Sequence, residues 1–316
     1  MTDGIKTAGF EIRTDLALEE REGLKEQAKE ASGVSFRKWQ GKTEDVQVTE
    51  VTVQNEAGAK SLGKPVGSYL TLEADRLLLP DEDFHSEVSD ELAELLKKLV
   101  EQSVGKEKET ETLNILVAGL GNQSVTPDSL GPRTVSNLSV SQNETGLKAI
   151  APGVMAQTGM ETAQILSGII REIKPDLVIA IDALAARSIR RLGTTIQLTD
   201  TGIHPGSGVG NHRHSLTKET LGIPVLAIGV PTVVGAAAIV HDTISALLGV
   251  LASEEATKNT GKWIENMDPQ DQYRLIRELL EPEFGSLYVT PPDIDQRVKQ
   301  LSFTISEGIH RAVLGR

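Results

Sequence analysis

Two aspartates stand where apolar runs of the sequence end. Asp128 lies in the turn-rich segment 119–132, which follows the apolar run Asn114–Ala118, and Asp182 directly follows the apolar run Leu177–Ile181. Open α/β sheets bind ligands beyond the carboxyl ends of their strands, so two such strands would bring both carboxyl groups to one cleft. Crowding raises the pKa of one carboxyl group, so one can hold a proton while the other activates water. The pair predicts general acid/base hydrolysis without a covalent intermediate, and the sequence does not assign the two roles.

Each aspartate also has a purely structural explanation. Asp128, within a Thr-Pro-Asp sequence, could be a helix N-cap or a turn residue. Asp182 could cap a following helix, although a carboxylate beside an apolar strand is costly unless it is paired, hydrogen-bonded or used in chemistry. Asn122 and Thr126 are polar neighbours of Asp128 in its loop, and we expect them to support it.

A third polar segment, Asp200–Asn211, follows a further apolar run and contains three glycines in five residues. Glycines let a ligand approach the backbone closely, and their amides could bind a peptide carbonyl or an anion. Mobility alone would also explain them. We expect this segment to lie at the same strand ends, with His204, Gly206 and Gly208 contributing to substrate binding.

Other constellations fit less well. His212 and His214 could bind a metal, but two histidines beside an arginine are more often polar surface, and we expect no metal. His204 and Ser207 lack the G-x-S-x-G elbow of a serine hydrolase. The glycines of segment 119–132 depart from the dinucleotide fingerprint at its third position, and no cofactor is expected.

The elements that would position these loops follow from the apolar pattern. Between residues 112 and 250, an apolar run, a turn and an amphipathic helix recur, with another strand at Val225–Val230. Thr158–Glu161 has capping-box form and starts a helix whose buried stripe is Ile165, Ile169 and Ile173. This alternation predicts an open, mostly parallel α/β sheet flanked by helices. Further helices are expected over Thr232–Leu251, near Gln270–Leu280 and over Asp293–Leu314.

The first part of the chain, residues 1–111, is polar and rich in charge. Val46–Val53 alternates apolar and polar residues, which predicts a half-buried strand, and residues 36–80 are expected to form a smaller β-containing subdomain. Apolar residues recur at helical spacing between Val88 and Leu99, with Ser89 as the expected N-cap.

Composition limits the function further. The 316 residues carry a formal net charge of −13, which disfavours direct binding to nucleic acid or to an anionic membrane. No cysteine is present, so thiolate chemistry and disulfides are excluded. Met1–Glu20 lacks an apolar signal core, and the apolar stretch Ile223–Leu251 contains His241 and Asp242. We therefore expect a cytoplasmic protein that does not span a membrane.

Long stretches of the sequence resemble the germination protease of spore-forming bacteria, which degrades small acid-soluble spore proteins. The N-terminal FEIRTDLALE (Phe10–Glu19) is also similar to the start of that family. The longer matching runs are GLGN–VTPDSLGP (Gly119–Pro132), APGVMAQTGMET (Ala151–Thr162), KPDLVIAIDALAARS (Lys174–Ser188), TTIQLTDTGIHPGSGVGN (Thr194–Asn211) and LGIPVLAIGVPTVV (Leu221–Val234).

The resemblance implies an endopeptidase of the forespore and spore core that is made as a zymogen, trims its own propeptide and forms a homotetramer. It implies a fold related to that of hydrogenase maturation endopeptidases. By analogy with those relatives, the catalytic acids are those of the VTPD and IDALAA runs, here Asp128 and Asp182. The enzyme would be an atypical aspartic-type peptidase. The connection 133–150 is short for the family, which leaves its effect on oligomerisation open.

The resemblance also places a propeptide at residues 1–15, with cleavage between Asp15 and Leu16 and a peptidase domain over 16–316. The segment Thr-Asp-Leu-Ala-Leu-Glu mimics the substrate pattern of an acid, an apolar residue, alanine, a variable residue and glutamate. A cationic contact for the acid is expected from Arg187, Arg190 or Arg191, which are candidates by position, and at least two of the three are expected to lie on a solvated helix face instead. Two alternatives remain: a metal-dependent maturation peptidase of similar fold, and a non-catalytic anion-binding α/β protein.

Overall fold

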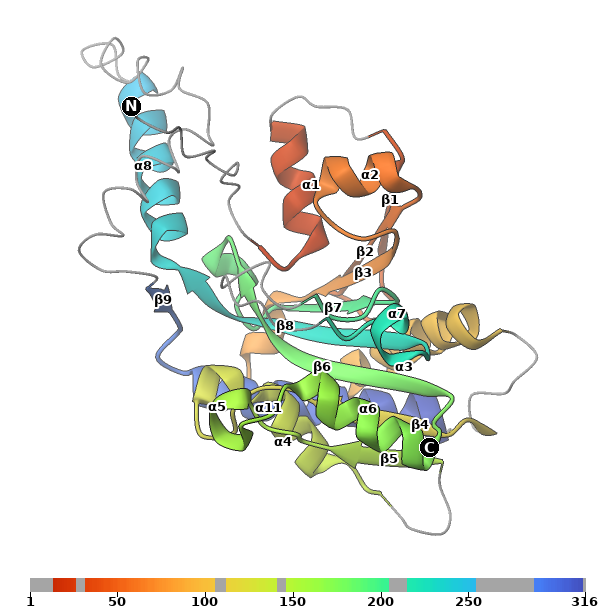
Figure 1. Cartoon of the computed structure of the whole chain (residues 1–316). Coiled ribbons are helices and arrows are strands. Elements are labelled where there is room, and N and C mark those ends of the chain that lie inside the picture. Colours follow the sequence, from red (N-terminus) through yellow and green to blue (C-terminus); the bar gives the residue numbers. More distant parts are fainter. Residues whose placement is uncertain are drawn as a thin grey trace, which may run out of the picture.

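The backbone is organised around one long mixed β-sheet (Figure 1). The computed structural model describes residues 14–26, 32–105, 112–140, 146–204, 215–253 and 287–314. Within them the sheet has nine strands in the order β1-β2-β3-β7-β8-β6-β4-β5, and β9 also pairs with β8. The strands are β1 (Val34–Gln40), β2 (Gln47–Val53), β3 (Gly67–Glu73), β4 (Ile115–Gly119), β5 (Leu147–Ile150), β6 (Leu177–Ala186), β7 (Thr195–Thr199), β8 (Val225–Gly235) and β9 (Tyr288–Val289).

The expected α/β sheet flanked by helices is confirmed, but the sheet is mixed. Parallel pairing is confined to β4–β5, β4–β6 and β6–β8. The pairings β1–β2, β2–β3, β3–β7, β7–β8 and β8–β9 are antiparallel. Strands β1 to β3 come from the region 36–80 and its margin, and they join the same sheet through the β3–β7 pairing.

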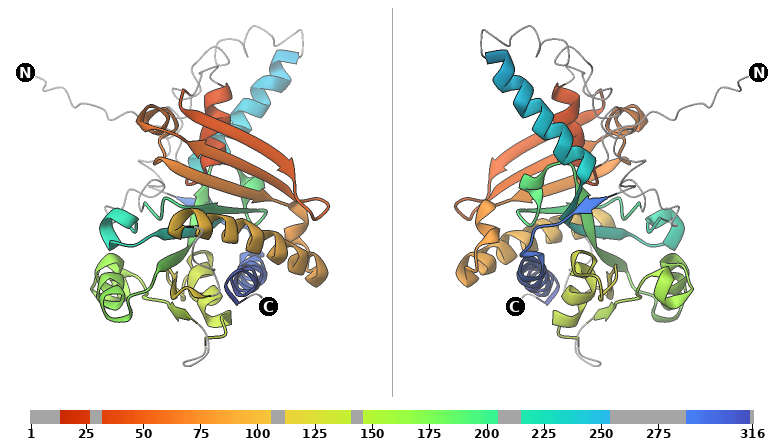
Figure 2. Two further views of the ribbon diagram at one scale, coloured as in Figure 1. Left: turned by 90° about the vertical axis from the view of Figure 1, so that its right-hand side faces the viewer. Right: turned by 90° about the vertical axis from the view of Figure 1, so that its left-hand side faces the viewer.

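Helices cover both faces of the sheet (Figure 2). α3 and α11 lie side by side on one face, together with α4, whereas α6 and α7 lie on the other. No described helix is both long and apolar enough to cross a bilayer. The helices, with short 3-10 turns marked η, are α1 (Ala17–Glu26), α2 (Glu56–Leu62), η1 (Asp75–Leu78), α3 (Glu82–Val104), η3 (Thr126–Asp128), α4 (Leu130–Asn137), α5 (Met155–Thr158), α6 (Thr162–Ile173), η4 (Ile189–Arg191), α7 (Lys218–Leu221), α8 (Ala236–Ser253) and α11 (Ile294–Leu314).

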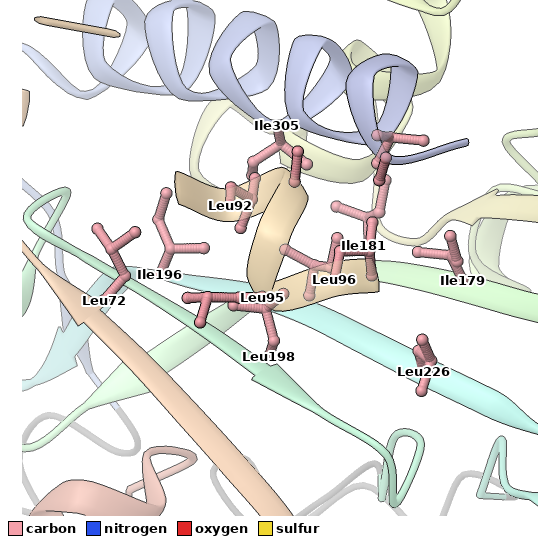
Figure 3. Packing of buried hydrophobic residues seen from close by; sticks show 14 of the residues in the cluster. Leu72, Leu92, Leu95, Leu96, Ile179, Ile181, Ile196, Leu198, Leu226 and Ile305 are labelled. Atoms are coloured by element: carbon pink, nitrogen blue, oxygen red, sulfur yellow. The ribbon is translucent and has the colours of Figure 1, made fainter. Parts of the chain in front are cut away.

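Alternation along the central strands divides the core between these two layers. Ile179 and Ile181 of β6 face α3 and α11, and Figure 3 shows them with Leu92 and Leu96 of α3 and Ile305 of α11. The intervening β6 residues Val178 and Ala180 belong to the cluster under α6. Because each fully buried leucine or isoleucine contributes roughly 1.5–3 kcal/mol, this double layer fixes the strands that carry the site.

Several helix starts differ from the sequence expectation. The N-cap of α3 is Asp81, whose side chain accepts a hydrogen bond from the N–H of Phe84 at 3.1 Å, so the expected cap at Ser89 is wrong. Ser89 is buried within α3, and its hydroxyl donates to the carbonyl of His85 at 2.9 Å. The capping box at Thr158–Glu161 is also wrong, because Thr158 ends α5 and α6 begins at Thr162 without a side-chain cap.

The buried stripe of α6 is shifted from the expected one. Leu166 and Ile170 are its buried apolar residues, and Ile169 and Ile173 pack partly against the same cluster. The predicted strands over 46–53, 114–118, 177–181 and 225–230 and the predicted C-terminal helix are confirmed. The helix expected near Gln270–Leu280 lies outside the described residues.

Strands β6 and β8 continue well beyond their predicted ends. They remain paired past Asp182, with Ala183 opposite Val230 and Ala185 opposite Val233. Asp182 therefore lies within a strand instead of ending one, and the helix expected from Thr232 begins only at Ala236.

Candidate active site

The loop after β4 holds Asp128 in a closed turn. Its Oδ2 accepts a hydrogen bond from the N–H of Asn122 at 2.7 Å, and its own N–H donates to the carbonyl of Val125 at 2.8 Å. Asp128 does not cap α4, because Ser129 occupies that N-cap position. The carboxylate thus closes its own loop, and Asn122 supports it through the backbone N–H.

Two glycines allow this loop to lie directly on the ends of β4 and β6. Gly121 has a φ of 109°, and a Cβ there would lie 2.0 Å from the carbonyl oxygen of Asp128. A Cβ on Gly131, in the first turn of α4, would lie 2.4 Å from the carbonyl oxygen of Leu120 and 2.6 Å from that of Ile181. A side chain at Gly121 would push Asp128 out of its turn, and one at Gly131 would push the start of α4 away from Leu120 and from β6.

Asp182 lies beside this loop in the parallel part of the sheet. Gly119, the last residue of β4, pairs with Ile181, and the N–H of Leu120 donates to the Ile181 carbonyl at 2.8 Å. Asp182 is the next residue of β6, and η3, which contains Asp128, contacts β6 and β8. Oδ1 of Asp182 accepts the N–H of Ala183 at 3.0 Å. The structure therefore brings both aspartates to the same end of the sheet.

The other polar residues of the Asp128 loop are also fixed. The side-chain oxygen of Asn122 accepts from the N–H of Ser124 at 3.0 Å and from Nε2 of Gln157 at 2.8 Å. The carbonyl of Thr126 accepts the hydroxyl of Ser129 at 2.8 Å. These contacts connect the loop to α5 and to the start of α4.

The described part of the third polar segment, residues 200–204, leaves the sheet at the opposite end, so the expected place of His204 beside the aspartates is wrong. Thr199 of β7 pairs with Ala227, whereas Asp182 pairs with Gly229, further along β8. Since β7 is antiparallel to β8, the chain moves away from Asp182 as it reaches His204. Sequence patterns give a strand's position but not its direction.

Gly206 and Gly208 lie outside the described residues, as do His212 and His214. Among the residues that the structure describes, no cluster of three or more His, Cys, Asp or Glu side chains could hold a metal ion.

The N-terminal segment Thr14–Glu19 is packed onto the end of β6. The N–H of Asp15 donates to the carbonyl of Ala185 at 3.0 Å, and the N–H of Ala185 donates to Oδ2 of Asp15 at 2.8 Å. Leu16 is fully buried in a cluster with apolar side chains that include Ala186 and Val234. The bond between Asp15 and Leu16 is thus bound within the fold.

Gln197 of β7 is a site residue that the sequence analysis missed. Its Oε1 accepts the N–H of Ala17 at 2.8 Å, and its Nε2 donates to the carbonyl of Asp15 at 3.3 Å. It therefore holds the chain on both sides of Leu16. The sequence did contain a signal for this residue, because a glutamine is unusual in an otherwise apolar and threonine-rich strand. In the structure every residue of β7 is buried.

Glu19 is a second buried contact of this segment. One carboxylate oxygen accepts the N–H of Arg187 at 2.8 Å and the other accepts that of Ser188 at 3.0 Å, and the hydroxyl of Thr14 donates to the first. Burial nevertheless raises the pKa of Glu19 above its ordinary value, although these hydrogen bonds and Arg191 act in the opposite direction.

The three arginines that were candidates for contacting an acid differ from one another in their surroundings. The guanidinium of Arg191 pairs with Glu22 at 2.9 Å and also with Glu73. Arg190 is exposed. Arg187 contacts the segment through its backbone N–H to Glu19. The Asp15 carboxylate accepts the backbone N–H of Ala185.

A weak likeness exists to the crystal structure of the NiFe hydrogenase maturation protease HycI from Thermococcus kodakarensis KOD1. The TM-score is 0.34 with 17% sequence identity, over 68% of this chain and 98% of that chain.

Comparison of the sequence with known proteins gives much stronger matches. A family model described as "Germination protease" matches residues 11–263. The germination protease of Caldanaerobacter subterraneus subsp. tengcongensis is 48% identical over 316 residues, which covers 96% of this chain and 94% of the relative. That of Clostridium perfringens is 40% identical, covering 96% and 95%, and that of Bacillus mycoides is 38% identical, covering 99% and 96%. The chain is therefore a peptidase that belongs to the germination protease family.

Proposed function

We propose that this chain is an endopeptidase that initiates the degradation of small acid-soluble spore proteins during germination, and that Asp128 and Asp182 catalyse the cut. The observation that carries the proposal is that Asp128 lies in the loop after β4, Asp182 lies in β6 just past the point where the β4–β6 pairing ends, and η3 contacts β6. Each carboxylate also accepts a backbone N–H through one oxygen.

Two carboxyl groups at one sheet end can divide the work of hydrolysis. One, protonated, donates to the scissile carbonyl as charge develops on its oxygen, and the other removes a proton from the attacking water. The water attacks the carbonyl carbon, and the aspartate that took its proton passes that proton to the leaving amine as the C–N bond breaks. The other aspartate recovers its own proton as the carbonyl re-forms. No covalent intermediate with the enzyme forms, and the reaction needs neither a metal nor a thiolate.

We further propose that the chain is a zymogen from which residues 1–15 are removed. In support, Asp15 lies opposite Ala185, three residues beyond Asp182 and so roughly 10 Å further along the strand. The Asp15–Leu16 bond would then have to leave this position before Asp182 of the same chain could act on it. A homotetramer in the cytoplasm of the forespore and spore core completes the proposal.

Purified chain tests this function directly. After incubation, mass spectrometry should find a new N-terminus at Leu16, and small acid-soluble spore proteins added to the processed enzyme should be cut into large fragments. A chain that keeps its N-terminus and leaves these proteins intact under every activating condition would contradict the proposal. A metal-dependent peptidase would instead lose activity in chelator.

A further inference from the structure

Strand β6 has an edge that its neighbour β4 does not cover. The β4–β6 pairing ends at Gly119 and Ile181, and β6 continues to Ala186 toward the start of α1 (Figure 1). On its other side, β6 stays paired with β8 along this extension. Within the described ranges, no strand pairs with β6 beyond Ile181 on the side of β4.

The backbone groups of two alanines point to this edge. Along a strand, the N–H and C=O of alternate residues point the same way, so Ala183 and Ala185 share the direction of Ile181, whose carbonyl accepts from Leu120. The N–H of Ala183 already donates to Asp182. An incoming peptide that used this edge would therefore lie alongside the Asp182 carboxylate.

The chain itself shows how a peptide binds there. Asp15 bonds Ala185 through its backbone N–H and through its side-chain carboxylate, so both polar groups of Ala185 are used. The next side chain, Leu16, enters a buried apolar pocket formed with Leu192, Val234 and other residues of its cluster. One backbone hydrogen bond to the strand edge is thus combined with a side-chain pocket, and both features also occur where exposed sheet edges recognise extended peptides.

We propose that the Ala183–Ala185 edge of β6 is the substrate-binding edge of this peptidase. An extended peptide first docks alongside it, with a carboxylate side chain on the N–H of Ala185 and the neighbouring apolar side chain in the Leu16 pocket. From this docked position the peptide has to shift by roughly 10 Å along the edge toward Asp182 before the bond between these two residues is cut. Asp15 and Leu16 occupy the edge in this structure and compete with substrate for it. The inference rests on the proposed function for its substrate, but the edge can be tested by binding alone.

The probe is a labelled synthetic peptide with the sequence Phe10–Glu20, and the receptor is the full-length chain carrying Asp128→Asn. Binding of the peptide to the receptor is measured by fluorescence anisotropy. Adding Asp15→Ala to the receptor should tighten peptide binding about tenfold, because the chain's own segment loses its carboxylate contact. A peptide N-methylated at its aspartate, which lacks the N–H for the Ala185 carbonyl, should bind about tenfold more weakly than its parent.

A variant pair tests the edge from the protein side. Ala185→Pro removes the N–H toward the peptide but not the pairing with β8, whereas Ala185→Ser keeps both. Binding should fall with proline and persist with serine, and circular dichroism shows whether the proline variant is folded. Equal binding of the N-methylated and parent peptides, or no effect of Asp15→Ala, would overturn the proposal even if the proline variant failed to fold.

The same samples separate this inference from the proposed function. If the Asp128→Asn receptor cuts the peptide, as mass spectrometry would reveal, the catalytic proposal fails while the binding data still decide the edge. If the peptide remains whole and the N-methyl and Asp15→Ala effects are absent, the edge fails while the aspartate mechanism stands.

Discussion

Asp15 and Ala185 contact each other in both directions: the N–H of Asp15 donates to the carbonyl of Ala185 at 3.0 Å, and the N–H of Ala185 donates to the Asp15 carboxylate at 2.8 Å. Residues far apart in the sequence thus share one strand edge, close to Asp182. The contact makes the N-terminal segment part of the site. Three predictions concern the stability of its docking on β6 and the packing of the helical layer that supports β6.

Docking of Thr14–Glu19 should depend on pH through Glu19. Burial raises the pKa of the docked Glu19 carboxyl group above its ordinary value, so the docked state favours the protonated form. Docking should therefore be strongest at pH values below the ordinary pKa of a glutamate, weaken as the pH rises through the raised pKa of Glu19, and level off above it. Hydrogen exchange of the 17–20 amides, corrected for intrinsic rates, measures this.

Glu19→Gln is the matched variant for that experiment. Its amide oxygen can accept from one of the two N–H groups of Arg187 and Ser188, its NH2 cannot accept from the other, and it does not titrate. The pH dependence should therefore disappear while part of the protection remains. Glu19→Ala should lose protection at all pH values, because two buried N–H groups are then left without this acceptor, at a cost of about 1–3 kcal/mol. Identical pH profiles for wild type and Glu19→Gln would contradict the account.

Gln197→Ala should loosen the segment without unfolding the sheet. The change removes both side-chain contacts around Leu16, and two ordinary hydrogen bonds contribute about 1–3 kcal/mol together. Exchange at residues 15–18 should rise about tenfold or more, and thermal unfolding of the sheet should change little. Gln40→Ala, on an exposed strand position, is the control and should leave exchange at residues 15–18 unchanged.

The helical layer of α3 and α11 supports the site, and creating a cavity in it should lower the unfolding free energy. Leu96 of α3 is fully buried beneath α11 and against β6 (Figure 3), so Leu96→Ala should cost about 2–5 kcal/mol of unfolding free energy. Leu79→Ala, at a position 54% exposed, should cost far less. Denaturant unfolding of both variants checks this, and equal losses would show that the layer is not packed as described.

The sequence was a good guide to strand position and a poor guide to strand extent. Buried apolar runs such as 177–181 are clear because both faces of a parallel strand need apolar residues. The extension Asp182–Ala186 is rich in alanine, which has high helix propensity, but its pairing with β8 overrides that preference. The Ala183–Ala185 edge of β6 was therefore not predicted, because the sequence indicated a loop and the start of a helix there.

The candidate site was predictable only in part. Asp128 and Asp182 could be named because a carboxylate beside an apolar strand requires an explanation, and the turn that holds Asp128 does contact the strand that holds Asp182. His204 could not be placed, because the antiparallel direction of β7 depends on pairing with β3 and β8. Gln197 was missed because its partner segment is remote in the sequence and a single buried polar residue gives no pattern.

The most direct measurement of the central claim is self-cleavage by Asp128→Asn and Asp182→Asn, followed by mass spectrometry for a new N-terminus at Leu16. Asp176→Asn is the control, since Asp176 lies before β6 and accepts the N–H of Asn114 at 3.0 Å. Each site variant should stay folded and keep residues 1–15, with cleavage reduced at least about a thousandfold, while the control is processed. Normal processing of either site variant would contradict a mechanism that requires both aspartates.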